Sequence, residues 1–141
     1  MRKNILFVDD DEDILFCYKM MTDLENIVVY TASSVNSALT IVSETKIDVA
    51  VLDYMLPGLN GDMLAKQIIK IDPEIKIFFV SGFDIALEAI KKLDIEVYGV
   101  FMKPVEPGLF RKIANTDEYS SIDYQATSVQ FGNQYSNVQI I

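Results

Sequence analysis

The sequence contains no histidine and only one cysteine, Cys17. Histidine is the commonest metal ligand and the usual general base, so its absence excludes zinc sites and Ser-His-Asp chemistry. A single cysteine also excludes an intramolecular disulfide framework. Because Cys17 lies among apolar residues in a segment of helical period, we expect it to be an inert thiol in the core.

Basic residues are scarce and form no cluster, and the formal net charge is −9. Proteins that bind nucleic acids or anionic membranes need such a cluster to neutralise phosphates. No apolar run is long enough to cross a bilayer, and the first run reaches Asp9 before the hydrophobic region of a signal peptide could be complete. We therefore expect a cytoplasmic protein that binds neither nucleic acid nor membrane directly.

The length of 141 residues, half of them hydrophobic, suits one core and is too short for two ordinary domains. We expect the folded domain to occupy residues 1–115. From residue 116 to residue 141 the composition shifts to Ser, Thr, Asn, Gln and Tyr, and no helical period persists. This polar segment is expected to be a flexible tail or a docking segment.

Short apolar runs rich in β-branched residues alternate five times with segments of helical period, which is typical of an α/β fold with a parallel sheet. Strands are predicted at residues 5–8, 27–30, 47–52, 75–80 and 97–102. Helices are predicted after each strand, with Ser33 or Ser34 capping the second, and with later ones at residues 62–71, 85–93 and 107–114. Proline and glycine mark a loop at residues 54–61.

Charged and hydroxyl side chains stand where the predicted strands end. Asp9 and Asp10 follow the first strand, Asp53 the third, Ser81 the fourth and Lys103 the fifth. In an open parallel sheet, ligands bind outside the carboxyl ends of the strands, where the strand order reverses. Three carboxylates, one hydroxyl and one ammonium group are therefore expected to converge at one edge of the sheet.

Neighbouring carboxylates raise one another's pKa unless a cation neutralises them, so this all-oxygen group suits Mg²⁺ or Mn²⁺. Lys103 can balance only part of the negative charge. A metal held by one or two carboxylates keeps positions open for phosphate oxygens, which an ammonium and a hydroxyl group would also bind. The pattern indicates a site that stabilises phosphoryl transfer.

Four ordered motifs carry a family resemblance, and together they are far more specific than any one alone. They are Phe7-Val8-Asp9-Asp10, Leu52-Asp53-Tyr54-Met55-Leu56-Pro57-Gly58-Leu59-Asn60-Gly61, Val80-Ser81-Gly82 and Phe101-Met102-Lys103-Pro104. Over about residues 1–115 the sequence resembles a stand-alone response-regulator receiver domain of two-component signalling. The resemblance implies a doubly wound, flavodoxin-like sheet of five parallel strands in the order 2-1-3-4-5, with helices on both faces.

The resemblance also implies roles for the residues of the site. Asp53 is expected to be the phosphoacceptor nucleophile, and Ser81 and Lys103 are expected to hold the phosphoryl oxygens. The phosphoryl group would come from a phosphohistidine on a sensor histidine kinase or a histidine phosphotransfer protein, which fits a chain without histidine.

For the metal, the resemblance implies that Asp10, Asp53 and the backbone carbonyl of Met55 bind Mg²⁺, while Asp9 assists through water. Asp11, Glu12 and Asp13 are better explained as the acidic start of the first helix than as metal ligands.

Phosphorylation adds nearly two negative charges and is expected to repack the surface of the fourth helix, fifth strand and fifth helix. The output would be a change in affinity for a target protein, or relay of phosphate to a histidine-containing transfer protein. We expect a phosphoprotein that is a monomer or a phosphorylation-dependent dimer. It would catalyse only its own phosphorylation and dephosphorylation, so it is not expected to be an enzyme in the usual sense.

Two other functional classes stay open. A phosphate-independent adaptor would keep the fold without the chemistry. A magnesium-dependent phosphohydrolase also uses an aspartate nucleophile, but its usual second acid is replaced here by Met55. Flavin or dinucleotide binding is disfavoured because neither a Gly-x-Gly-x-x-Gly fingerprint nor a P-loop occurs.

Two features depart from the family pattern. An aromatic residue usually stands three positions before the lysine, where this sequence has Val100. Strand alternation would place Tyr98 on the face of Val100, so Tyr98, or a loop shift after Ser81, is a candidate to report phosphorylation. The side chains that tune hydrolysis in the family are Met55 and Phe83 here. Neither can orient water, so we expect the phosphoryl group to be lost slowly, over minutes or longer.

Overall fold

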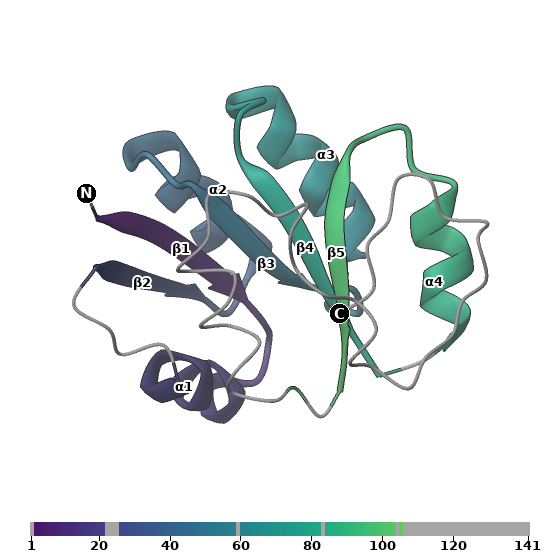
Figure 1. Cartoon of the computed structure of the whole chain (residues 1–141), viewed down its shortest axis with the longest axis horizontal. Helices are drawn as coiled ribbons and strands as arrows, with labels where there is room; N and C mark the ends of the chain where they lie inside the picture. Colours follow the sequence, from purple (N-terminus) through teal and green to yellow (C-terminus); the bar gives the residue numbers. More distant parts are fainter. Residues whose placement is uncertain (1, 22–25, 59, 83, 104, 106–141) are drawn as a thin grey trace.

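The computed structural model describes residues 2–21, 26–58, 60–82, 84–103 and 105, except for the side chains of residues 21 and 84–87. The strands are β1 (Lys3–Val8), β2 (Ile27–Ala32), β3 (Val49–Asp53), β4 (Lys76–Ser81) and β5 (Val97–Met102). The helices are α1 (Glu12–Met21), α2 (Val35–Glu44), α3 (Gly61–Ile71) and α4 (Asp84–Lys91). All neighbouring strands pair in parallel, in the order β2-β1-β3-β4-β5, which confirms the predicted fold (Figure 1).

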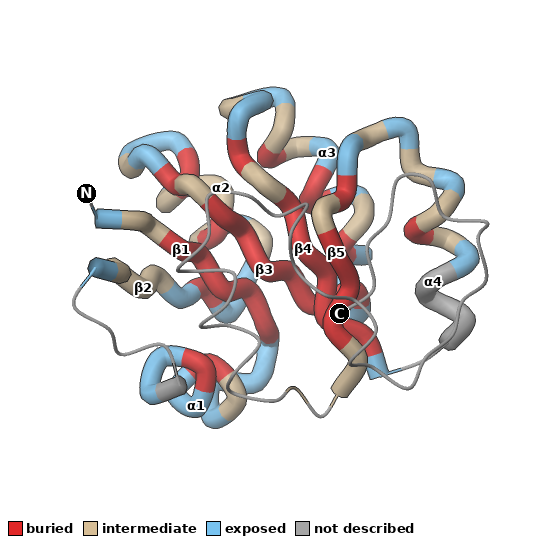
Figure 2. Tube along the Cα trace, in the orientation of Figure 1, coloured by how far each residue is buried: buried red, intermediate tan, exposed pale blue. Residues whose placement is uncertain are grey.

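Helices pack on both faces of the sheet. On one face, buried residues of α2, α3 and α4, such as Ala38, Leu64 and Ile90, pack against Leu6, Leu52 and other side chains of the sheet. On the other face, Leu15 and Tyr18 of α1 pack in a second cluster with Phe7 and Val51. The central strand β3 is buried along its whole length, as Figure 2 shows, whereas β2 at the sheet edge is mostly half-buried. This burial explains why β3 reads as a continuous apolar run.

Most predicted boundaries agree with the observed ones to within two residues. Ser34, one of the two candidate caps, begins α2 with a capping box shared with Ser37. The predicted helix at residues 107–114 and the polar segment at residues 116–141 lie outside the described residues. Within the described residues, no helix combines the length and apolar character needed to span a membrane.

The predicted position of Tyr98 is wrong, because strand β5 contains an irregularity. Ile77 of β4 pairs with Val97, but the next residue, Phe78, pairs with Gly99, so Tyr98 is an extra residue on β5. Such a bulge interrupts the alternation of side chains. Tyr98 consequently packs beside Phe78 on the α1 face, whereas Val100 lies in the cluster on the opposite face. Tyr98 therefore does not take the place of an aromatic residue at position 100.

The expectation of a core thiol is also wrong, since Cys17 is exposed. Helix α1 buries Leu15 and Tyr18 against the sheet and leaves Phe16 and Met20 exposed beside the cysteine. Because nearly every residue between positions 14 and 21 is apolar, the sequence of this helix contains no clear polar face. Only the contact with the sheet decides which side is buried.

Candidate functional site

The carboxyl ends of β1 and β3 bring two buried aspartates together. Asp9 directly follows β1 and Asp53 is the last residue of β3, and these strands are paired up to Val8 and Leu52. The strand order reverses between β1 and β3, since the chain runs to β2 on one side and to β4 on the other. Asp9 is 1% exposed and Asp53 is 6% exposed. The predicted edge of the sheet therefore holds carboxylates in a largely dry position.

Asp10 completes a group of three carboxylates. Asp9, Asp10 and Asp53 each offer one carboxylate oxygen, and these oxygens lie within 4.8 Å of one another. Unlike the other two, Asp10 is exposed. The group therefore combines two buried carboxylates with one that borders solvent, which is a geometry suited to a partly hydrated divalent cation.

Only one of the two carboxylate oxygens of Asp9 accepts a hydrogen bond within the described residues. Its Oδ1 accepts a hydrogen bond from the backbone N–H of Asp11 at 2.9 Å, while its buried Oδ2 has no hydrogen-bond partner in the part of the chain that the structure describes. Burial raises the pKa of Asp9 to about 6, opposed by the Asp11 N–H and reinforced by the charge of Asp53. A buried carboxylate oxygen without a donor fits a bound cation, so these residues match an Mg²⁺ or Mn²⁺ site.

Lys103 supplies the positive charge that the sequence predicts. Its Nζ lies 3.3 Å from Oδ2 of Asp53 and 3.6 Å from Oδ2 of Asp9. Partial burial lowers the pKa of Lys103, but the two carboxylates outweigh this effect, and the pKa lies above its usual value. The ammonium group is therefore charged at neutral pH. One lysine facing three carboxylates leaves an excess of negative charge that a divalent cation would neutralise.

The carboxyl group of Asp53 is oriented from two sides. Its Oδ1 accepts a hydrogen bond from the backbone N–H of Met55 at 3.2 Å, and its Oδ2 accepts one from Lys103. The next residue, Tyr54, extends the ladder by donating its N–H to the carbonyl of Val80 at 3.0 Å. The side chain of Met55 is 54% exposed. The backbone of residues 53–55 is thus fixed, while the surface beside the carboxylate carries no polar side chain at position 55.

Ser81 is fully buried at the end of β4 and pairs with Met102 of β5. Its carbonyl accepts a hydrogen bond from the N–H of Lys103 at 2.9 Å. The backbone of Ser81 thereby helps to fix the strand end that carries the lysine. A contact between the Ser81 hydroxyl and a phosphoryl group stays a prediction.

The acids after Asp10 belong to the start of α1. Oδ1 of Asp11 accepts hydrogen bonds from the N–H groups of Asp13 at 2.9 Å and Ile14 at 3.3 Å, so Asp11 caps the helix. Glu12 and Asp13 occupy its first turn and are exposed. The prediction that these three acids serve the helix start is confirmed for Asp11 by its hydrogen bonds and fits the position of the other two.

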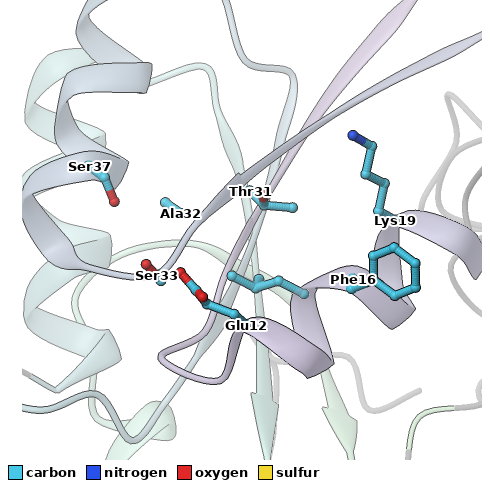
Figure 3. A pocket seen from close by; sticks show the side chains of 8 residues that line it. Glu12, Phe16, Lys19, Thr31, Ala32, Ser33 and Ser37 are labelled. Carbon is cyan, nitrogen blue, oxygen red and sulfur yellow. The ribbon is translucent and has the colours of Figure 1, made fainter.

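A separate hollow of about 410 Å³ lies between α1, the end of β2 and the start of α2 (Figure 3). It is lined by Glu12, Leu15, Phe16, Lys19, Thr31, Ala32, Ser33 and Ser37. None of the three grouped aspartates contributes to this hollow, and its polar lining comes mainly from exposed side chains. It is therefore distinct from the carboxylate site.

With this geometry in place, comparison with known proteins decides the family. The sequence model of the response regulator receiver domain matches residues 5–115. The chain belongs to this family. Relatives of this receiver include the regulatory protein VanR of Enterococcus faecium, 30% identical over 107 residues. The alkaline phosphatase synthesis transcriptional regulatory protein PhoP of Bacillus subtilis (strain 168) is 31% identical over 107 residues.

The alignments with VanR and PhoP each cover 76% of this receiver but only 46% and 45% of those proteins, so the chain spans about half their length. Among solved structures, a CheY-like response regulator receiver domain protein from Methanospirillum hungatei JF-1 matches with a TM-score of 0.72 and 30% identity. That match covers 80% of this chain and 91% of the other chain. The family and the strand order implied by the sequence motifs are both confirmed.

Proposed function

We propose that this receiver accepts a phosphoryl group on Asp53 from a phosphohistidine on another protein and thereby changes its affinity for a partner. The observation that carries the proposal is the position of the Asp53 carboxylate. It is nearly buried, lies 3.3 Å from Lys103, and belongs to a group of three carboxylates at the edge of the sheet. An aspartate whose duty was only to cap a turn would not need a partly buried ammonium partner.

The chemistry assigns a nucleophilic role to Asp53. A carboxylate oxygen of Asp53 forms a bond to phosphorus while the bond between phosphorus and the imidazole nitrogen of the donor breaks, and the nitrogen retains the electron pair. Because this sequence contains no histidine, the phosphohistidine belongs to a sensor histidine kinase or a histidine phosphotransfer protein. The hydrogen bonds of Met55 and Lys103 to the two carboxylate oxygens hold the nucleophile in one orientation before the donor arrives.

Two kinds of group would stabilise the charge on the phosphoryl oxygens. Asp9, Asp10, Asp53 and the backbone carbonyl of Met55 would hold Mg²⁺ or Mn²⁺, which supplies positive charge to those oxygens when bound. Lys103 adds an ammonium group that stays charged, and Ser81 adds a hydroxyl donor. The raised pKa of Asp9 and its unsatisfied oxygen support the metal assignment.

Phosphorylation would convert this local charge into a signal. The phosphoryl group adds nearly two negative charges beside Asp9 and would compete with the carboxylates for Lys103. Because Lys103 directly follows β5, its movement would be passed to the end of that strand and to β4 through the bond to Ser81. A target protein in the cytoplasm would then bind the changed surface, or the phosphoryl group would be passed on to a phosphotransfer protein. The receiver would act as a monomer or a phosphorylation-dependent dimer and would not contact nucleic acid or membrane directly.

Intact-mass spectrometry with Mg²⁺ and acetyl phosphate tests the proposal. The wild-type protein is expected to gain a single phosphoryl adduct, which should require the metal and disappear in Asp53→Asn. The matched control is Asp94→Asn, the same change at a carboxylate that is 86% exposed and pairs with Lys66. This control should gain the adduct at the wild-type rate. An adduct that persists in Asp53→Asn would exclude Asp53 as the acceptor.

A further inference from the structure

The first residue of α3 lies against the backbone of the proposed phosphoacceptor. Gly61 is buried, and its N–H donates a 2.7 Å hydrogen bond to the carbonyl of Tyr54. A β-carbon added at this position would overlap the carbonyl oxygen of Asp53 and would lie 2.9 Å from the α-carbon of Tyr54. Only glycine lets the helix begin this close to the end of β3.

The contact is between backbones, which leaves no side chain that could rotate away. Helix α3 is anchored in the core by Leu64, Ala65 and Ile68, all of them fully buried. A methyl group at position 61 would therefore press on residues 53 and 54 rather than move the whole helix. In a closely packed interior such a displacement is passed to the next bonded groups.

The groups bonded next to residues 53 and 54 include the backbone N–H of Met55, which helps to orient the Asp53 carboxylate. Its Oδ1 is held by the N–H of Met55, two residues along the same segment, and its Oδ2 is held by Lys103. We infer that Gly61 is a positioning residue, which sets the backbone of Asp53 and Met55 and thereby the geometry of the nucleophile and of the carbonyl at position 55. This inference rests on the proposed role of Asp53.

A second glycine, in the loop that precedes α3, provides a matched control. Gly58 has a φ of +77°, a conformation that L-residues rarely adopt, yet an added β-carbon there would meet no atom of the described residues within 4 Å. Gly58→Ala should therefore destabilise the loop through backbone strain without pressing on Asp53. Gly61→Ala should destabilise the protein and also disturb the site, so the two variants separate general loop damage from loss of positioning.

The experiment measures three properties of the wild type, Gly61→Ala and Gly58→Ala. They are the rate of adduct formation from acetyl phosphate, the Mg²⁺ dissociation constant by calorimetry, and the backbone amide resonances of residues 53–55 and 103. For Gly61→Ala we expect the rate to fall and the Mg²⁺ affinity to weaken by about tenfold or more, with shifted resonances at these residues. For Gly58→Ala we expect a lower melting temperature, with rate and affinity within about threefold of the wild type.

The inference would be overturned if Gly61→Ala folds and keeps the wild-type rate, Mg²⁺ affinity and amide resonances. It would also be overturned if Gly61→Ala and Gly58→Ala weaken the Mg²⁺ affinity equally. If the wild type forms no adduct, the proposed function fails, whereas the amide resonances still test the positioning by Gly61. If Gly61→Ala does not fold, titration of the wild type with Mg²⁺ answers the question. The Gly61 amide should then shift more than the Gly58 amide, and an unmoved Gly61 amide would contradict the inference.

Discussion

Replacement of Asp9 by asparagine should stabilise the metal-free protein at neutral pH. The carboxylate of Asp9 is almost fully buried, and its Oδ2 accepts no hydrogen bond within the residues described. The amide side chain of Asp9→Asn would keep an oxygen for the N–H of Asp11 and would remove a negative charge that lies close to Asp53. It would also remove the 3.6 Å ion pair with Lys103, but burial outweighs this attraction, because the pKa of Asp9 is raised overall. The change therefore removes the cost of a buried charge while it retains the local hydrogen bond.

The size of the effect follows from the pKa of Asp9, which burial raises from 3.8 to about 6. A rise of about two pH units corresponds to about 3 kcal/mol, which is an upper value because solvent can enter the open edge of the site. Since the folded-state pKa is raised, the protonated form favours folding. The stability that Asp9 contributes is fully present below pH 3.8 and is lost as the pH rises through about 6.

Urea titrations followed by far-ultraviolet circular dichroism, in EDTA between about pH 5 and pH 8, measure this difference. At pH 8 the free energy of unfolding of Asp9→Asn is expected to be about 1–3 kcal/mol higher than that of the wild type. At pH 5 this difference should be smaller by about 1 kcal/mol. Added Mg²⁺ should stabilise the wild type more than the variant and so reduce the difference. A variant that is less stable than the wild type at pH 8, or a difference that does not change with pH, would refute the reasoning.

Four further results are expected. Leu64 is fully buried in α3, so Leu64→Ala should lower the free energy of unfolding by about 2–5 kcal/mol in urea titrations, and a loss below about 1 kcal/mol would contradict the packing described. Ser34→Ala removes the capping box of α2 and should cost about 1 kcal/mol in the same assay, whereas an unchanged midpoint would show that the cap contributes nothing. Because Cys17 is exposed, its thiol should react with Ellman's reagent in the native protein nearly as fast as in urea, and strong protection would place it in the core. The exposed side chain of Met55 cannot position water, so the phosphoryl adduct should persist for minutes or longer when followed by mass spectrometry, and loss within seconds would speak against this assignment.

The parallel sheet and the convergence of the site residues could be predicted because parallel strands impose simple patterns, whereas the strand order was implied by the family resemblance. Each strand is a short apolar run, and the residues that end it must lie at the same edge of the sheet as the ends of its neighbours. Asp53 and Lys103 are 50 positions apart in the sequence, yet their side chains meet at 3.3 Å. Strand direction places both residues at the same edge of the sheet, and because only β4 lies between β3 and β5, the long side chain of Lys103 can reach Asp53.

The difference between Asp9 and Asp10 could not be predicted in the same way. Both follow β1 and carry the same carboxyl group, but the first is buried and the second is exposed. The direction of each side chain depends on how the chain turns into α1, where the N–H of Asp11 holds Asp9. The sequence identifies the pair of acids, whereas the turn into α1, held by this hydrogen bond, decides which of them is buried.

The sequence of β5 contains a feature that is typical of a bulge. Gly99 is an isolated glycine inside a strand, a position that often marks a bulge. Strict alternation from Val100 would place Tyr98 on the wrong face, as the pairing of Phe78 with Gly99 shows. The buried side of α1 had no comparable signal, because the apolar residues around Cys17 surround the helix.

Borohydride reduction of the phosphorylated protein tests the central claim most directly. Reduction of an aspartyl phosphate yields homoserine at the modified position, which peptide mass spectrometry identifies. After incubation with Mg²⁺ and acetyl phosphate, homoserine is expected at position 53 and not at Asp9 or Asp10, the other two carboxylates of the group. Homoserine at either of those positions, or a phosphoryl adduct that yields no homoserine at position 53, would contradict the assignment of Asp53 as the phosphoacceptor.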